Sequence, residues 1–121
     1  MSNVCPSALS PVATMRKLHH VVYVIELDLS ILTDKKFRAA NPHHNPRLQC
    51  LYVGSTGLTA KERFKNHRNG HKSNRYVRNY GIKLLPQMYE QYPAMTWENA
   101  LGKEKELAEE LRGKGYAVWQ H

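Results

Sequence analysis

Cysteine is scarce in this sequence of 121 residues, and long apolar runs are absent. The two cysteines, Cys5 and Cys50, match no CxxC pattern, so neither a disulfide framework nor a cysteine-based metal site is expected. Such thiols favour a reducing, intracellular setting, and we expect a cytoplasmic or nucleoid-associated protein. No stretch approaches the roughly 18–20 apolar residues that span a bilayer, and residues 1–17 lack the apolar run of a secretory signal. We therefore expect no membrane partner.

Acidic residues are also few. The chain has 10 Asp and Glu against 18 Lys and Arg, a formal net charge of +8 with histidine neutral. An excess of this size in a small protein favours a polyanionic partner, and nucleic acid is a better candidate than an anionic membrane surface. With 41% hydrophobic residues, the chain can bury one modest core.

The length favours a single domain. Residues 1–17 are rich in Ser and Pro and show no hydrophobic period, which predicts a mobile N-terminal tail before one domain at 18–121. Residues 28–49 also lose the pattern, and they predict a long inserted loop with a helical turn near 35–40.

The hydrophobic pattern predicts an α/β protein of the α+β type. β-Branched and aromatic runs predict three strands, at 20–27, 50–54 and 84–92. The element order is β-β-α-α-β-α, followed by a short extended segment at 116–119. We therefore predict a small, three-stranded, mostly antiparallel central sheet flanked by helices, because each helix must bury one face.

Two of the three expected helix starts carry cap signals. Thr59 and Glu62 have the spacing of a capping box, and Gly70 is placed to end that helix. Ser73 can cap a second, short helix whose inner face is Tyr76, Val77 and Tyr80, and a third helix runs from about 96 to 112.

The third helix carries an apolar stripe with one irregular member. The stripe residues are Trp97, Leu101, Leu107, Ala108 and Leu111. Glu104 falls on the same seam, where a carboxylate is costly unless it is paired, protonated or bound to a cation. A structural ion pair, or a seam edge close to solvent, is the alternative explanation.

Two basic side chains share the inner face of the first helix. Arg63 and His67 lie beside Ala60 and Phe64 at three- and four-residue steps. Arg63 can pair with Glu104 or hold a phosphate, and His67 can be structural or catalytic. His67 and His71 also have the spacing of a zinc pair, although no third ligand is evident.

These residues resemble the GIY-YIG nuclease family. Val22-Tyr23-Val24 and Tyr52-Val53-Gly54 look like the paired signature, with Val22 in place of Gly and Val24 in place of Ile. Further residues are similar, in identity and spacing, to those of the small stand-alone members and the DNA-repair members. These more specific matches are Ser55, Thr56, Leu58, Arg63, His67, Gly70, Ala100, Leu101 and Glu104. The resemblance covers about residues 19–119.

The sequence departs from the family pattern at two places. The segment between Tyr23 and Tyr52 is longer than usual, which marks 28–49 as an insertion. Many members also carry an asparagine near the C-terminus that helps the active site. Here no asparagine follows Tyr116, and Gln120 is the residue that can substitute.

The resemblance implies a metal-dependent DNA endonuclease. Glu104 would hold one Mg²⁺ or Mn²⁺ ion, and Arg63 would contact the scissile phosphate. Tyr23 is the candidate general base, with Tyr52 donating to it or orienting water, and His67 either shares the proton handling or binds a phosphate oxygen. Gly54 would allow the backbone to pass close to the site.

A basic cluster between residues 61 and 78 suggests a docking surface for DNA. Its members are Lys61, Lys65, Arg68, Lys72, Arg75 and Arg78. Contacts of this kind to phosphates position a duplex without reading its sequence, so we expect low sequence specificity and a separate targeting partner. A solvated face is the alternative for this cluster. For the whole chain, the alternatives are a non-catalytic, nucleic-acid-binding domain with a degenerate GIY-YIG fold, or a zinc-dependent interaction module.

Overall fold

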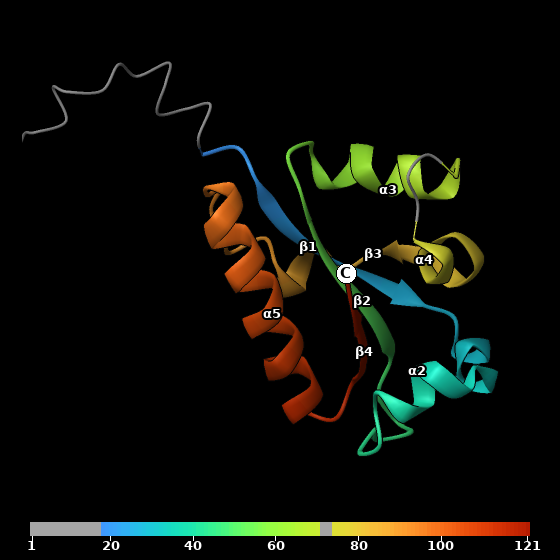
Figure 1. Cartoon of the computed structure of the whole chain (residues 1–121). Coiled ribbons are helices and arrows are strands. Elements are labelled where there is room, and N and C mark those ends of the chain that lie inside the picture. Colours follow the sequence, from blue (N-terminus) through green and yellow to red (C-terminus); the bar gives the residue numbers. More distant parts are fainter. Residues whose placement is uncertain (1–17, 71–73) are drawn as a thin grey trace, which may run out of the picture.

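A four-stranded mixed sheet forms the centre of the computed structural model, which describes residues 18–70 and 74–121. The strand order is β3-β1-β2-β4, with helices on both faces (Figure 1). The strands are β1 (Val21–Leu27), β2 (Cys50–Thr56), β3 (Gly81–Leu84) and β4 (Ala117–Gln120). β1 is antiparallel to β2 and β3, whereas β4 is parallel to β2. The expected α+β class is confirmed, but the expected three-stranded sheet is wrong, because 116–119 contributes a fourth strand.

Side chains alternate across β1 and β2 and enter two separate cores. Tyr23 and Ile25 pack into one buried cluster with Tyr52, while Val24 packs with Val53 in the other. Because both faces of the sheet are covered, the strands are apolar throughout rather than alternately polar.

Helix α5 (Trp97–Gly113) covers one face, at the left of Figure 1, together with the segment that contains Leu85 and Met88. The other face carries the shorter helices. They are α2 (Lys35–Ala39), α3 (Ala60–Arg68) and α4 (Arg75–Tyr80). None of the helices in the described ranges is both long and apolar enough to cross a membrane.

The capping box predicted for α3 is confirmed. The Thr59 hydroxyl accepts from the Glu62 backbone N–H, and the Glu62 carboxylate accepts from that of Thr59. Gly70, with φ of 81°, follows the helix end as expected. The cap of α4 was assigned to the wrong residue: Asn74 caps it, and Ser73 lies outside the described residues.

The strand predicted at 84–92 is wrong over most of its length. The strand is β3, which ends at Leu84, and the 3-10 helix η3 (Pro86–Met88) follows. Pro86 explains the difference, because proline fixes φ near −65° and cannot donate to a sheet ladder.

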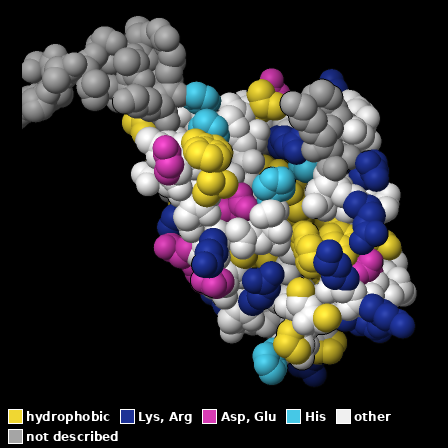
Figure 2. Space-filling view, viewed as in Figure 1, with side chains coloured by type: hydrophobic (Ala, Val, Ile, Leu, Met, Phe, Trp, Pro, Cys, Tyr) yellow, Lys and Arg dark blue, Asp and Glu magenta, His cyan; other side chains and the backbone are white. Residues whose placement is uncertain are grey.

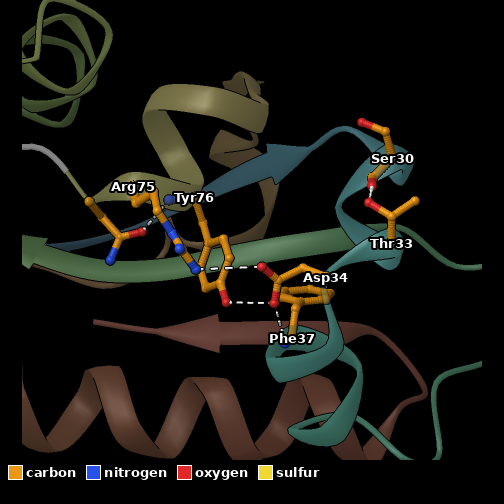
Figure 3. Close-up of polar contacts among 7 residues, drawn as sticks. Ser30, Thr33, Asp34, Phe37, Arg75 and Tyr76 are labelled. Carbon is orange, nitrogen blue, oxygen red and sulfur yellow. Dashed lines mark hydrogen bonds and ion pairs between the residues drawn. The ribbon is translucent and has the colours of Figure 1, made fainter.

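The inserted segment is more ordered than the sequence predicts. It contains the 3-10 helix η2 (Leu29–Thr33) and α2, and the helical turn expected near 35–40 is confirmed. Asp34 caps α2 by accepting from the Phe37 backbone N–H (Figure 3). The same carboxylate accepts from the Tyr76 hydroxyl at 2.9 Å and pairs with Arg75 at 3.5 Å, so the insertion is bonded to α4 (Figure 3).

Asn41 joins the insertion to β4. Its amide donates to the carbonyl oxygens of Phe37 and Val118, and its oxygen accepts from the Val118 N–H at 2.7 Å. Arg112 donates to the same oxygen. One buried amide therefore pairs with both backbone groups of Val118 in β4, whose carbonyl also accepts from Arg112 Nη2.

We expect Asn41→Ala to lower the free energy of unfolding by about 1–3 kcal/mol, because it leaves the buried backbone N–H of Val118 without a partner. Urea denaturation measures the change. Asn79→Ala, at an exposed position on α4, is the matched control. Equal losses in the two variants would contradict the anchoring role.

Candidate active site

Two buried tyrosines form the centre of the candidate site. Tyr23 on β1 and Tyr52 on β2 are 1% and 0% exposed, and their ring centroids lie 6.2 Å apart. Gly54 pairs directly with Tyr23 across the strands. A Cβ at Gly54 would lie 2.7 Å from the Tyr23 hydroxyl oxygen and 3.1 Å from Tyr52 Cε2. The expected close backbone approach at Gly54 is therefore present.

His67 reaches the Tyr23 hydroxyl from α3. The ring is fully buried, and Nε2 lies 3.0 Å from Tyr23 Oη. Nδ1 accepts a hydrogen bond from the backbone N–H of Asn74 at 3.2 Å. A backbone N–H can only donate, so Nδ1 carries no proton and Nε2–H donates to Tyr23.

The charge state of His67 agrees with this tautomer. Burial, together with the positive charges of Arg63 and His121, lowers the pKa of His67 to about 4. His67 is therefore neutral at pH 7 and acts as a donor to the phenol.

Opposing effects set the ionisation of Tyr23. The pKa of Tyr23 is raised to about 12, mainly by burial. The charge and hydrogen bonding of Arg63 oppose this rise, the charge of Glu104 adds to it, and hydrogen bonding from Tyr52 opposes it. The pKa of Tyr52 is raised further, mainly by burial and by negative charge on Tyr23. Of the two phenols, Tyr23 ionises first.

Glu104 on α5 is buried at the face of the sheet opposite to the one that carries Tyr23 and Tyr52. It is 1% exposed, as its position on the α5 seam predicts. Ser55 Oγ donates to Oε2 at 2.8 Å, and the Gln120 amide donates to Oε1 at 3.3 Å. Gln120 therefore lies beside the predicted metal ligand. Trp97 and Leu101 were expected on the buried stripe, but they are 56% and 38% exposed, because the core against α5 is formed from Leu107 onward.

Two neutral polar side chains surround the Glu104 carboxylate, namely the Ser55 hydroxyl and the Gln120 amide, which faces it through its nitrogen. A single carboxylate of this kind suits a hard cation whose other ligands are waters and phosphate oxygens. The described residues contain no group of three or more His, Cys, Asp or Glu side chains that could hold a metal. His71, the second member of the predicted zinc pair, lies outside them.

Four less buried side chains form the rim of the site. Ser55, Arg63 and Gln120 are half-buried, and His121 is exposed. His121 Nδ1 lies 3.2 Å from the Tyr52 hydroxyl, and its backbone N–H donates to Val53 O at 3.0 Å.

Basic side chains gather away from α5. Figure 2 shows Lys and Arg mostly over the α2, α3 and α4 side, at the right, and acidic side chains mostly over α5. The predicted docking residues that are exposed are Lys61, Lys65, Arg68, Arg75 and Arg78. Arg75 is engaged by Asp34 and by the Tyr76 ring, whose centroid lies 4.9 Å from its guanidinium. Lys72 lies outside the described residues.

Three residues that contribute to the candidate site were not predicted from the sequence. Ser55 has the same strand parity as Leu51 and Val53, which predicts that it faces α5. His121 directly follows Gln120 in the closing extended run. Asn74 acts through its backbone, for which the sequence carries no signal.

We expect the stability of the protein to fall between pH 6.5 and 4 because of His67. The unfolded chain binds a proton near the ordinary value of 6.5, whereas the folded His67 binds one only near 4. Stability is therefore greatest above pH 6.5, and the loss reaches about 3 kcal/mol at pH 4. Urea denaturation of His67→Gln should show a flatter pH dependence. His43→Gln, at an exposed position, should keep the original slope, and an unchanged slope in His67→Gln would contradict the assignment.

Comparison with known proteins gave no relative. No protein-family model, curated protein or solved structure matched the chain. The function is therefore inferred from the residues of the candidate site and their geometry.

Proposed function

We propose that this protein is a metal-dependent DNA endonuclease with a GIY-YIG-like fold, which hydrolyses phosphodiester bonds with low intrinsic sequence specificity. The supporting observation is a cluster of four side chains of suitable chemistry on one face of the sheet, together with a buried carboxylate on the other face. Tyr23, Tyr52, Arg63 and His67 interact with one another, and the charge of Glu104 acts on both phenols. In addition, the two signature tripeptides are direct antiparallel partners, with Tyr23 opposite Gly54.

Each of these residues has a task that its surroundings support. The scissile phosphate gains negative charge as water attacks, so catalysis needs positive charge and a proton acceptor. The guanidinium of Arg63 provides a planar pair of donors for phosphate oxygens. Tyr23 accepts the proton of the attacking water, and the Nε2–H of His67 stabilises the resulting oxygen charge. Glu104 would hold Mg²⁺ or Mn²⁺, which supplies charge to the phosphate and the leaving oxygen.

The α3 surface is the proposed docking face. Lys61, Lys65 and Arg68 are exposed and recur at helical spacing on α3, the helix that also carries Arg63 and His67. A duplex held there by its phosphates would lie next to the rim of the site. Such contacts do not read base sequence.

Glu104→Gln is expected to abolish Mg²⁺-dependent nicking of a supercoiled plasmid, because the amide cannot provide the negative charge that holds the cation. Thermal stability and duplex binding should be close to those of the unchanged protein. Glu109→Gln alters an exposed carboxylate on the same helix, and it should nick normally.

Two other outcomes would reject the proposal in different ways. Full nicking by Glu104→Gln would remove Glu104 as the metal ligand. If the unchanged protein bound duplex DNA but did not nick it with Mg²⁺ or Mn²⁺, the protein would be a non-catalytic binding domain.

Salt dependence tests the docking face. Each neutralised phosphate contributes about 0.9 to the slope of log binding constant against log salt. Replacing Lys61, Lys65 and Arg68 together by Gln should therefore reduce that slope by about 2–3. The control replaces Lys103, Lys105 and Lys114 on or beside α5, which changes the net charge equally. Equal effects of the two triple variants would contradict a docking face on α3.

A further inference from the structure

Trp119 on β4 places a second aromatic surface beside the candidate site. It pairs in register with Tyr52 on β2, and directly paired residues of neighbouring parallel strands lie on the same face of the sheet. The buried rings of Phe37 and Tyr76 hold the indole, with centroids 6.5 Å and 4.9 Å from that of Trp119. Trp119 itself is only half-buried, so it is oriented by the core and is still accessible from the surface.

Two exposed cations lie over this aromatic surface. Lys36 Nζ is 5.6 Å from the centroid of the Trp119 ring, and the guanidinium carbon of Arg75 is 4.9 Å from that of Tyr76. Lys36 belongs to α2 in the inserted segment, and it forms no salt bridge within residues 18–70 and 74–121. We call Trp119, Lys36 and Arg75 the Trp119 patch.

The surroundings of the Trp119 patch are basic. Asp34 also lies here, but its charge is paired with Arg75, and it accepts from the Tyr76 hydroxyl (Figure 3). Two further basic residues of α2 are exposed, namely Lys35 and Arg38. Figure 2 shows apolar side chains bordered by Lys and Arg on the α2 and α4 side of the molecule. The patch therefore combines an aromatic ring with an excess of positive charge.

This combination suits a single strand of nucleic acid. An unpaired base stacks on an aromatic ring whatever its identity, because every base has a π-face, while nearby cations bind the flanking phosphates. In a duplex, the bases are already stacked on one another and are not available to Trp119. A base that stacked on the indole would displace the Lys36 ammonium from the ring, and the phosphate beside that base would then accept its charge.

We propose that the Trp119 patch binds an unpaired stretch of DNA, so that the preferred substrate is a duplex that carries a single-stranded arm. This inference rests on the proposed function, and it gives the inserted segment, which supplies Lys36 and Phe37, a part in substrate binding. The His67 ring of α3 lies 5.7 Å from the Tyr52 ring, and Trp119 is the strand partner of Tyr52. A duplex on α3 and an arm on the Trp119 patch would therefore meet at the rim of the candidate site.

The two tryptophans of the chain allow a direct test of stacking. Trp97→Phe leaves Trp119 as the fluorescent indole, and we expect oligo(dT) to quench its emission, while a blunt duplex of the same length quenches it much less. Trp119→Phe leaves Trp97, which is 56% exposed on α5, and its emission should be unchanged by either DNA. The titrations are made without a divalent cation, so that binding is measured apart from cleavage.

The affinity for oligo(dT) tests the ring and the cation of the Trp119 patch separately. Trp119→Ala should weaken binding by about 5- to 140-fold, the usual worth of one stacked base. Lys36→Gln should reduce the slope of log binding constant against log salt by about 0.7, as expected for the loss of one phosphate contact to a single strand. Lys105→Gln removes an exposed charge on α5, and it should leave both quantities unchanged.

Failure of this inference and failure of the proposed function give different results. Absent quenching of Trp119 by oligo(dT), equal quenching by the duplex, or tighter binding of oligo(U) RNA would overturn the inference. If the protein cleaves DNA, a duplex with a single-stranded arm should have a higher kcat/KM than a blunt one, and Trp119→Ala should remove that advantage. Quenching of Trp119 in a protein that cleaves no DNA with Mg²⁺ or Mn²⁺ would reject the endonuclease and support the Trp119 patch as a binding surface alone.

Discussion

The candidate site depends on the hydrogen bond between His67 and the Tyr23 hydroxyl. This bond joins α3 to β1, and it requires a glycine at position 54, because a Cβ there would lie 2.7 Å from the phenol oxygen. The backbone N–H of Asn74, at the start of α4, then decides which nitrogen of His67 carries the proton. One phenol is thus oriented by a strand pair and by the junction of two helices, and these elements must fold together for it to be held.

The sequence predicts those parts of the fold that have local signals. The capping box at Thr59 and the apolar stripe of the last helix are local signals, so α3 and α5 were predicted close to their observed bounds. The fourth strand was missed as a sheet member because β4 has only four residues and is defined by parallel pairing with the distant β2. No local pattern encodes such a pairing. The predicted strand at 84–92 failed because its apolar residues also suit a 3-10 turn, and Pro86 favours the turn.

The same distinction applies to the site. A carboxylate on an apolar seam and a histidine on an inner helix face are visible in the sequence, and both Glu104 and His67 are buried in the structure. Their partners are not visible in that way. Ser55 and Gln120 reach Glu104 from two different strands, and His121 reaches Tyr52 only because β4 lies beside β2. The spacing of residues along the sequence predicts which polar side chains are buried. Their hydrogen-bond partners and proton positions depend on the tertiary arrangement.

Two charges act on the Tyr23 phenol in opposite directions, and they come from opposite faces of the sheet. Arg63 on α3 lowers the pKa of Tyr23, and Glu104 on α5 raises it. Burial strengthens both effects, because charges interact more strongly where the local dielectric is low. A cation held by Glu104 in the proposed reaction would remove the charge that opposes the phenolate, so metal binding and base formation would favour each other. A phenol whose pKa is raised to about 12 is therefore compatible with the role of a base. Hydrolysis would then be restricted to the loaded site.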